Sequence, residues 1–236
     1  GEDIGEIPEG YYPGEYLKSV GLDLVECYGD KYLNANEEEW LDPIKDFAVE
    51  RIMEMIRQDL QMINIKHDVF TNERVLIENG TLDQAFKTLK DNELIYTGTL
   101  PPPRGKEMDD WQPVPLTLFR SSNFGDDVDR PLKKRNGSWA YIMPDIAYHY
   151  DKIQRGFSLM INMLGKDHGG YEQRLGPAVA AFGNGKAKLK VVYNGMVKIL
   201  KNGQPVKLSK RSGNLITLRE MVEEVGADAV RFIMLT

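Results

Sequence analysis

The segment at residues 207–214 concentrates positive charge around a small hydroxyl residue. It reads Lys-Leu-Ser-Lys-Arg-Ser-Gly-Asn, which places Lys207, Lys210 and Arg211 within five residues of one another and around Ser209. Lysines on a loop act as flexible point charges, and they can neutralise a polyphosphate where charge develops in a transition state. A charge run of this kind is also typical of a solvated loop without a ligand, and the string alone leaves both interpretations open.

A phenol and a carboxylate are spaced four residues apart in Tyr141-Ile-Met-Pro144-Asp145. Pro144 predicts the start of a helix, so Asp145 would lie in the first turn, where the helix dipole keeps a carboxylate ionised. Tyr141 would end the preceding strand. Such a pair suits a planar guanidinium, which requires acceptors for its forked N–H groups. The alternative is that Asp145 only caps its helix.

A glycine-rich stretch, Gly165-Lys166-Asp167-His168-Gly169-Gly170, follows an apolar segment that we predict to be a strand. Glycines at such a position allow the backbone to approach a ligand closely, and an aspartate there can accept hydrogen bonds from ribose hydroxyls. The alternative is a tight strand-to-helix turn. The three histidines, His67, His149 and His168, are too scattered to predict a metal cluster, so we predict no metal ligands.

Strand and helix patterns alternate around these three segments. Asn136-Gly137 is a strong hairpin-turn signal, and Thr217 with Glu220 forms a capping-box pattern. Helices are predicted at 14–33 with an interruption near Gly21, and at 37–65, 81–90 (with Thr81 as N-cap), 144–154, 169–182, 217–225 and 228–235. Extended segments are predicted at 68–71, 94–96, 116–120, 157–163, 189–193 and 196–200. This order predicts an α/β fold with a parallel, doubly wound sheet whose ligands lie beyond the carboxyl ends of the strands.

Composition and charge exclude several classes of protein. Of the 236 residues, 42% are hydrophobic and 28% are charged. The sequence contains no run of 18 apolar residues, so no membrane span is predicted. The single cysteine, Cys27, excludes an internal disulfide and fits a reducing compartment. The acidic first residues predict neither a signal nor a transit peptide, so we expect a cytoplasmic protein. Residues 1–60 hold 16 acidic and 5 basic side chains, whereas residues 181–220 hold 9 Lys or Arg and one acid. That split indicates a polyanion bound at one place only, or simply a solvated face.

The motifs together resemble a known family. Residues 207–210, which we call the KLSK loop, are similar to the KMSK signature of class I aminoacyl-tRNA synthetases, with Leu208 where Met is usual. The order of all the motifs along the chain resembles that in arginyl-tRNA synthetases. The resemblance is most specific over residues 116–236 and weaker at 10–16. The matching segments are 124–131, 141–149, 151–157, 165–171, 196–197, 207–214, 217–218 and 226–232. The family's fold would be a Rossmann-like catalytic core, here incomplete and carrying an α+β insertion. The implied domains are an acidic, mainly helical segment (1–64), an insertion with a Pro-rich linker (65–115) and the second half of the core (116–236).

The resemblance also implies a reaction. ATP, with Mg²⁺ held on its phosphates, would activate L-arginine to arginyl-adenylate, and the arginyl group would pass to the 3′ end of an arginine-accepting tRNA. The implied roles are arginine binding by Tyr141 and Asp145, ATP binding by Gly165, Asp167, His168, Val206, Lys207 and Lys210, and catalysis by Lys207, Ser209 and Lys210. A monomer without membrane attachment is expected.

The sequence departs from that family in one respect that matters for activity. Class I synthetases carry a His-Ile-Gly-His-type motif, and none occurs in these 236 residues. The family's anticodon-binding domain is also missing, so we expect the chain alone to be inactive. Two alternatives stay open: another class I synthetase or nucleotidyl transferase, and a non-catalytic RNA-binding or interaction fragment.

Overall fold

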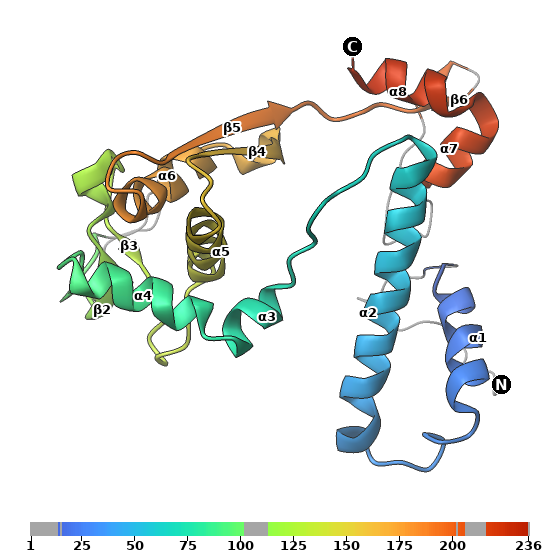
Figure 1. The fold of residues 1–236 in the computed structure, drawn as a ribbon, viewed down its shortest axis with the longest axis horizontal. Coiled ribbons are helices and arrows are strands. Elements are labelled where there is room, and N and C mark those ends of the chain that lie inside the picture. The colour runs from blue at the N-terminus through green and yellow to red at the C-terminus, as the bar shows by residue number, and fades with distance from the viewer. Residues whose placement is uncertain (1–13, 15, 102–112, 202, 206–215, 236) are drawn as a thin grey trace. The chain divides into compact units, whose positions relative to one another are not determined.

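The computed structural model describes residues 14, 16–101, 113–201, 203–205 and 216–235. The chain divides into two compact units, one formed by Phe70–Val197 and the other by Gly1–Val69 with Lys198–Thr236 (Figure 1). None of the described helices is both long and apolar enough to cross a membrane.

The unit Phe70–Val197, which we call the site unit, contains five strands and four α-helices among its described residues. The helices are α3 (Glu73–Glu78), α4 (Thr81–Asp91), α5 (Ile142–Gln154) and α6 (Tyr171–Phe182). The strands are β1 (Ile95–Gly98), β2 (Leu116–Phe119), β3 (Arg130–Pro131), β4 (Leu159–Gly165) and β5 (Lys188–Asn194). Two short 3₁₀ turns, η2 (Ser121–Phe124) and η3 (Lys166–His168), follow β2 and β4.

Strands β4 and β5 form a parallel pair that is joined through helix α6. The register runs from Leu159 opposite Lys188 to Gly165 opposite Asn194, so the two carboxyl ends lie side by side. The carboxylate of Glu172, in the first turn of α6, accepts a hydrogen bond of 3.0 Å from the backbone N–H of Val191. This β-α-β unit confirms the predicted α/β class and places the 165–170 segment where such sheets bind ligands.

Strands β1, β2 and β3 form a separate antiparallel sheet. Strand β1 pairs with β2 from Ile95 opposite Phe119 to Gly98 opposite Leu116. Residues on both sides of position 115 therefore belong to one sheet, so the observed packing does not separate residues 65–115 from residues 116–236. The three domains implied by the resemblance stay a prediction.

The core of the site unit lies between helices α4, α5 and α6 (Figure 1). Leu82, Ala85 and Leu89 recur at helical spacing, so α4 buries one face and leaves the other polar. They pack against residues of α5 and α6 and against the antiparallel sheet, including Phe119, Leu132, Met143, Ile146, Ala147, Leu175, Ala178 and Ala181. Because α5 packs on both α4 and α6, this core fixes the helix that carries Asp145.

The other unit is built on two long helices and a C-terminal pair. Its helices are α1 (Tyr16–Tyr28), α2 (Glu37–Met62), α7 (Leu218–Val225) and α8 (Ala227–Leu235), with a small hairpin of β6 (Leu200–Lys201) and β7 (Gln204–Pro205). Helix α2 has no fully buried residue and begins with three glutamates, where the helix dipole favours negative charge. Arg219 of α7 binds Asp59 of α2 at 2.7 Å. The predicted capping box is confirmed, since Thr217 and Glu220 exchange hydrogen bonds at the start of α7.

Several element predictions were wrong in detail. Helix α1 is continuous through Gly21, because a single glycine lowers helix stability without breaking the helix. Residues 68–71 form no strand, and α3 follows them instead. The N-cap of α4 is Gly80 in a left-handed conformation, and Thr81 is the first helical residue. The predicted strand at 196–200 contains only the start of β6, at Leu200.

Candidate functional site

A hairpin carries the chain into helix α5. Its turn contains Asn136, whose side-chain oxygen accepts hydrogen bonds from the backbone N–H and hydroxyl of Ser138, and Gly137, whose φ of +81° favours glycine. Lys133 and Trp139 form an isolated antiparallel β-bridge across the hairpin, which confirms the predicted turn. Tyr141 does not end a strand as predicted, because its backbone is already helical and it occupies the N-cap position of α5.

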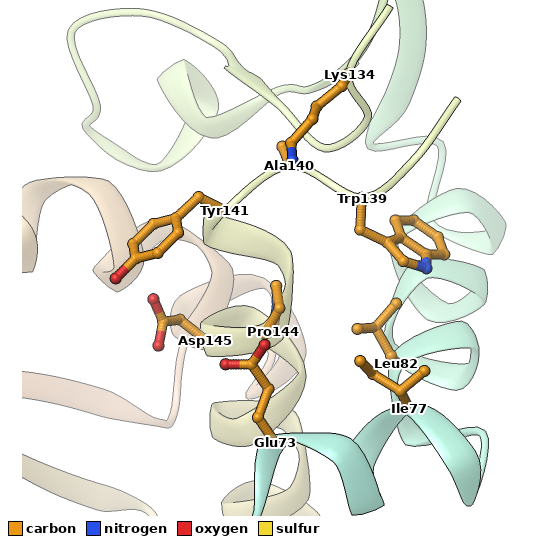
Figure 2. A pocket seen from close by; sticks show the side chains of 9 residues that line it. All are labelled: Glu73, Ile77, Leu82, Lys134, Trp139, Ala140, Tyr141, Pro144 and Asp145. Atoms are coloured by element: carbon orange, nitrogen blue, oxygen red, sulfur yellow. The ribbon is translucent and has the colours of Figure 1, made fainter. Parts of the chain in front are cut away.

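A cavity of about 260 Å³ opens between the N-terminal end of α5, the hairpin and helices α3 and α4 (Figure 2). Its volume is slightly below the usual range for small-molecule sites. The polar groups that line it are two carboxylates, a phenol and an ammonium group. The lining residues are Glu73, Ile77, Leu82, Lys134, Trp139, Ala140, Tyr141, Pro144 and Asp145.

Asp145 lies in the first turn of α5, as predicted. The phenol of Tyr171, the first residue of α6, lies close enough to this carboxylate for the two groups to interact. Burial raises the pKa of Tyr171 well above its usual value, and the neighbouring Asp145 carboxylate acts in the same direction. The phenol therefore stays protonated at neutral pH. Asp145 thus lies at the cavity and beside a side chain of a second helix.

Tyr141 is 88% exposed, and Figure 2 shows its ring above the Asp145 carboxylate. Glu73, in the first turn of α3, supplies a second carboxylate at the cavity that the sequence reasoning missed. Tyr171 was missed as well. The available signal was an aromatic residue directly after the paired glycines, where Gly170 adopts a φ of +83° and starts α6.

The segment after β4 is adjacent to this cluster. His168 contacts the ring of Tyr171 edge-on, with 6.2 Å between the ring centroids. The Nε2 atom of His168 lies 3.7 Å from Oδ2 of Asp167, and both side chains are well exposed at 51% and 82%. A Cβ atom at Gly165 would collide with Oδ1 of Asp167, so glycine leaves room for that carboxylate. The structure therefore brings two of the three predicted segments together, through Tyr171.

His149 is buried and does not line the cavity. It is 2% exposed, and its Nδ1 lies 2.8 Å from the backbone oxygen of Asp145. A carbonyl oxygen only accepts, so Nδ1 carries the proton and Nε2 accepts from the side-chain amide of Asn162 at 3.0 Å. Burial lowers the pKa of His149, and the positive charge of Lys152 acts in the same direction.

The third predicted segment cannot be placed. Val206, Lys207, Ser209 and Lys210 lie outside the described residues. Elsewhere, within the ranges that the structure describes, no group of three or more His, Cys, Asp or Glu side chains is positioned to hold a metal ion.

Comparisons with known proteins match the whole chain. It is 51% identical over 238 residues, 100% of its length, to an arginine–tRNA ligase of Beijerinckia indica, and 52% identical over 225 residues to one of Rhodospirillum rubrum. A crystal structure of an arginyl-tRNA synthetase from Campylobacter jejuni superimposes on 99% of the chain with a TM-score of 0.78 and 31% identity. Over its full length the chain is therefore similar to arginyl-tRNA synthetases.

The chain covers only part of the length of each of these relatives. The chain spans 40% of the length of the Beijerinckia ligase, 38% of the Rhodospirillum ligase and 47% of the Campylobacter chain. The arginyl-tRNA synthetase of Plasmodium falciparum shares the fold, with a TM-score of 0.53 over 94% of the chain at 17% identity. No family model matches. The similarity to arginyl-tRNA synthetases confirms the resemblance inferred from the motifs and supports the Rossmann-like class of the β4–α6–β5 unit.

Proposed function

We propose that this chain supplies the arginine-binding side of the aminoacylation site of an arginyl-tRNA synthetase. The observation that supports this most directly is the Asp145 carboxylate at a cavity that Glu73 and Tyr141 also line. A carboxylate at such a cavity is the acceptor that a guanidinium requires.

The cavity also favours a guanidinium over other side chains. A guanidinium has five donors in a rigid fork and no acceptor, so two carboxylates on different helices can receive donors from different nitrogens. In our proposal Asp145 accepts two parallel hydrogen bonds from the guanidinium, and Glu73 adds negative charge from α3. A lysine ammonium lacks the fork, and a citrulline ureido group replaces one donor with an acceptor and carries no charge.

The proposed chemistry needs no protein nucleophile. A carboxylate oxygen of arginine attacks the α-phosphorus of ATP, which forms arginyl-adenylate and releases pyrophosphate. A hydroxyl of the terminal tRNA ribose then attacks the arginyl carbonyl carbon, which forms the ester and releases AMP. The protein contributes positioning and stabilisation of charge, because the reacting groups all belong to the substrates.

The ATP side of the site rests on the segment after β4 and on the KLSK loop. We propose that Gly165, Asp167 and His168 face the adenosine ribose, since they follow the carboxyl end of a parallel strand. Lys207, Ser209 and Lys210 would neutralise the leaving pyrophosphate, with Val206 beside the nucleotide. Mg²⁺ would be carried mainly by the phosphates of ATP.

Aminoacylation requires more than this chain supplies in our proposal. The sequence holds no His-Ile-Gly-His-type motif, so we expect the 236 residues alone to be inactive. In a polypeptide of its relatives' length, the segment would act on L-arginine, ATP and an arginine-accepting tRNA, as a cytoplasmic monomer.

The test is aminoacylation kinetics in a polypeptide of the relatives' length that contains this segment. Asp145→Asn should lower kcat/KM for arginine by about 10- to 100-fold, the effect of losing charge-assisted hydrogen bonds of about 1.5–3 kcal/mol. The matched control is Asp151→Asn on the same helix, where Asp151 pairs with Arg155 at 2.9 Å outside the cavity. Equal effects of both substitutions would refute the assignment of Asp145.

A further inference from the structure

The hairpin that leads into α5 is strongly basic. Between Arg130 and Pro144 the sequence contains four cationic residues and no acidic one. Three of the cations, Lys133, Lys134 and Arg135, are consecutive and precede the Asn136-Gly137 turn. The arginine site as proposed makes no use of this charge, because a cation repels a guanidinium.

The hairpin holds these cations on an ordered backbone. The backbone N–H of Lys134 donates to the oxygen of Ser138 at 2.7 Å, and that of Gly137 donates to the oxygen of Lys134 at 2.9 Å. The backbone N–H of Ala140 donates to Leu132, which is fully buried in the core. The turn is therefore fixed to the same core that positions α5.

The three cations have different surroundings. The ammonium of Lys133 lies 4.5 Å from the ring centroid of Trp139 and 5.3 Å from that of Phe86, so these rings hold it at the base of the hairpin. Lys134 and Arg135 are exposed, and neither forms an ion pair or side-chain hydrogen bond with any residue that the structure describes. Two cations are thus available to an external anion.

Lys134 also lines the cavity of Asp145, and Figure 2 shows it on the hairpin side of that cavity. In the proposed reaction, the 3′ end of an RNA strand must reach the carboxyl group of the arginine bound there. Phosphate oxygens are the groups that exposed Lys and Arg side chains bind in protein–nucleic acid complexes.

We propose that the hairpin at residues 133–139 binds the phosphates of the single-stranded 3′ end of the tRNA through Lys134 and Arg135. The inference rests on the proposed function, because it uses the direction from which the RNA must approach. It adds an RNA contact that lies outside the KLSK loop. The contact recognises the backbone and not the bases, so it should be independent of the tRNA sequence.

The experiment uses a polypeptide of the relatives' length that contains this segment, with purified tRNA. Arg135→Ala and the double variant Lys134→Ala/Arg135→Ala are compared with the wild type and with Lys186→Ala/Lys188→Ala, which removes two exposed charges elsewhere in the site unit. The KM for tRNA should rise severalfold in Arg135→Ala and further in the double variant. Arginine affinity of Arg135→Ala, measured by calorimetry, should stay within twofold of the wild type.

Salt dependence gives a second readout. Each phosphate contact on a single strand contributes about 0.7 to the slope of log K against log salt concentration, so the double variant should lose about 1.4 from that slope. An unchanged tRNA KM and salt slope in the double variant would overturn the proposal. A loss of arginine affinity in Arg135→Ala would also overturn it, because the charge would then serve the amino acid. If the wild type bound no arginine, the proposed function itself would fail.

Discussion

The proposed recognition of arginine depends on one carboxylate and on the groups that hold it. Asp145 is placed in its helical turn by the local sequence, since Pro144 favours a helix start and the helix dipole favours a negative charge there. The phenol of Tyr171, on another helix, lies beside it. The sequence therefore predicted the carboxylate, whereas the phenol was missed because its contact with Asp145 exists only after α5 and α6 pack.

Substitution of Tyr171 tests the orientation of Asp145. Tyr171→Phe should weaken arginine binding about fivefold if the hydroxyl orients Asp145, because one hydrogen bond is worth about 1 kcal/mol. Isothermal titration of the variant with arginine measures this. The control is Tyr96→Phe, which removes a 2.8 Å hydrogen bond to Asp129 outside the cavity lining. The raised pKa of Tyr171 means that the folded state holds the phenolic proton more tightly than the unfolded state. Its contribution to stability is therefore full below about pH 10 and is lost as the pH rises through the folded-state value. Equal affinities in Tyr171→Phe and the wild type would show that the hydroxyl does not orient Asp145.

At the scale of elements, helix α5 is the part that connects the core to the site. Its buried side, with Met143, Ile146 and Ala147, packs in the core, while its first turn faces the cavity. His149 joins the backbone of that first turn to Asn162 on β4. Pro144 predicted a helix over 144–154, close to the observed Ile142–Gln154, but it could not show which buried residue links α5 to the sheet.

The pH dependence of unfolding tests the role of His149. Its pKa is lowered in the folded state, so the unfolded state binds the proton more strongly. Its contribution to stability is therefore present above pH 6.5 and is lost as the pH falls through the folded-state pKa. Denaturant unfolding from pH 7.5 to 5 should show a smaller acid-induced loss of stability in His149→Gln than in the wild type. Identical pH slopes would contradict this account of the buried imidazole.

Short elements explain most of the remaining errors of prediction. Helix α3 has only six residues, and its neighbour Asp68–Thr71 contains the β-favouring residues Val69, Phe70 and Thr71, which also suit a strand. Local patterns of that length do not distinguish helix from strand, and tertiary packing decides between them. Glu73 was missed as a cavity residue for the same reason, since α3 was not expected.

At the scale of the whole molecule, the apolar core is unevenly distributed between the two units. The buried apolar residues of the described chain lie mainly in Phe70–Val197, whereas the other unit buries only Val20, Ile63 and Val230 among its described residues. Sequence composition predicted the acidic, exposed helix α2 but not that residues 65–115 and 116–197 share one core. That sharing depends on the pairing of β1 with β2 and of α4 with α5, which are non-local contacts.

A core truncation tests this distribution. Leu89 is fully buried between α4 and its neighbours, so Leu89→Ala should lower the free energy of unfolding of the site unit by about 2–5 kcal/mol. Hydrogen exchange should show faster exchange of amides in α4, α5 and α6, with α2 unchanged. If α2 lost protection to the same extent, the chain would unfold as a single cooperative unit and the division into two would be contradicted.

The most direct measurement of the central claim is the thermal stability of the 236-residue chain with L-arginine, L-citrulline and L-lysine. Saturating ligand at about 100 times its dissociation constant stabilises the native state by roughly 2.7 kcal/mol. We predict a rise in Tm with arginine alone, which is lost in Asp145→Asn and retained in Asp151→Asn. No rise with arginine, or an equal rise with citrulline or in Asp145→Asn, would contradict a guanidinium site formed by these residues.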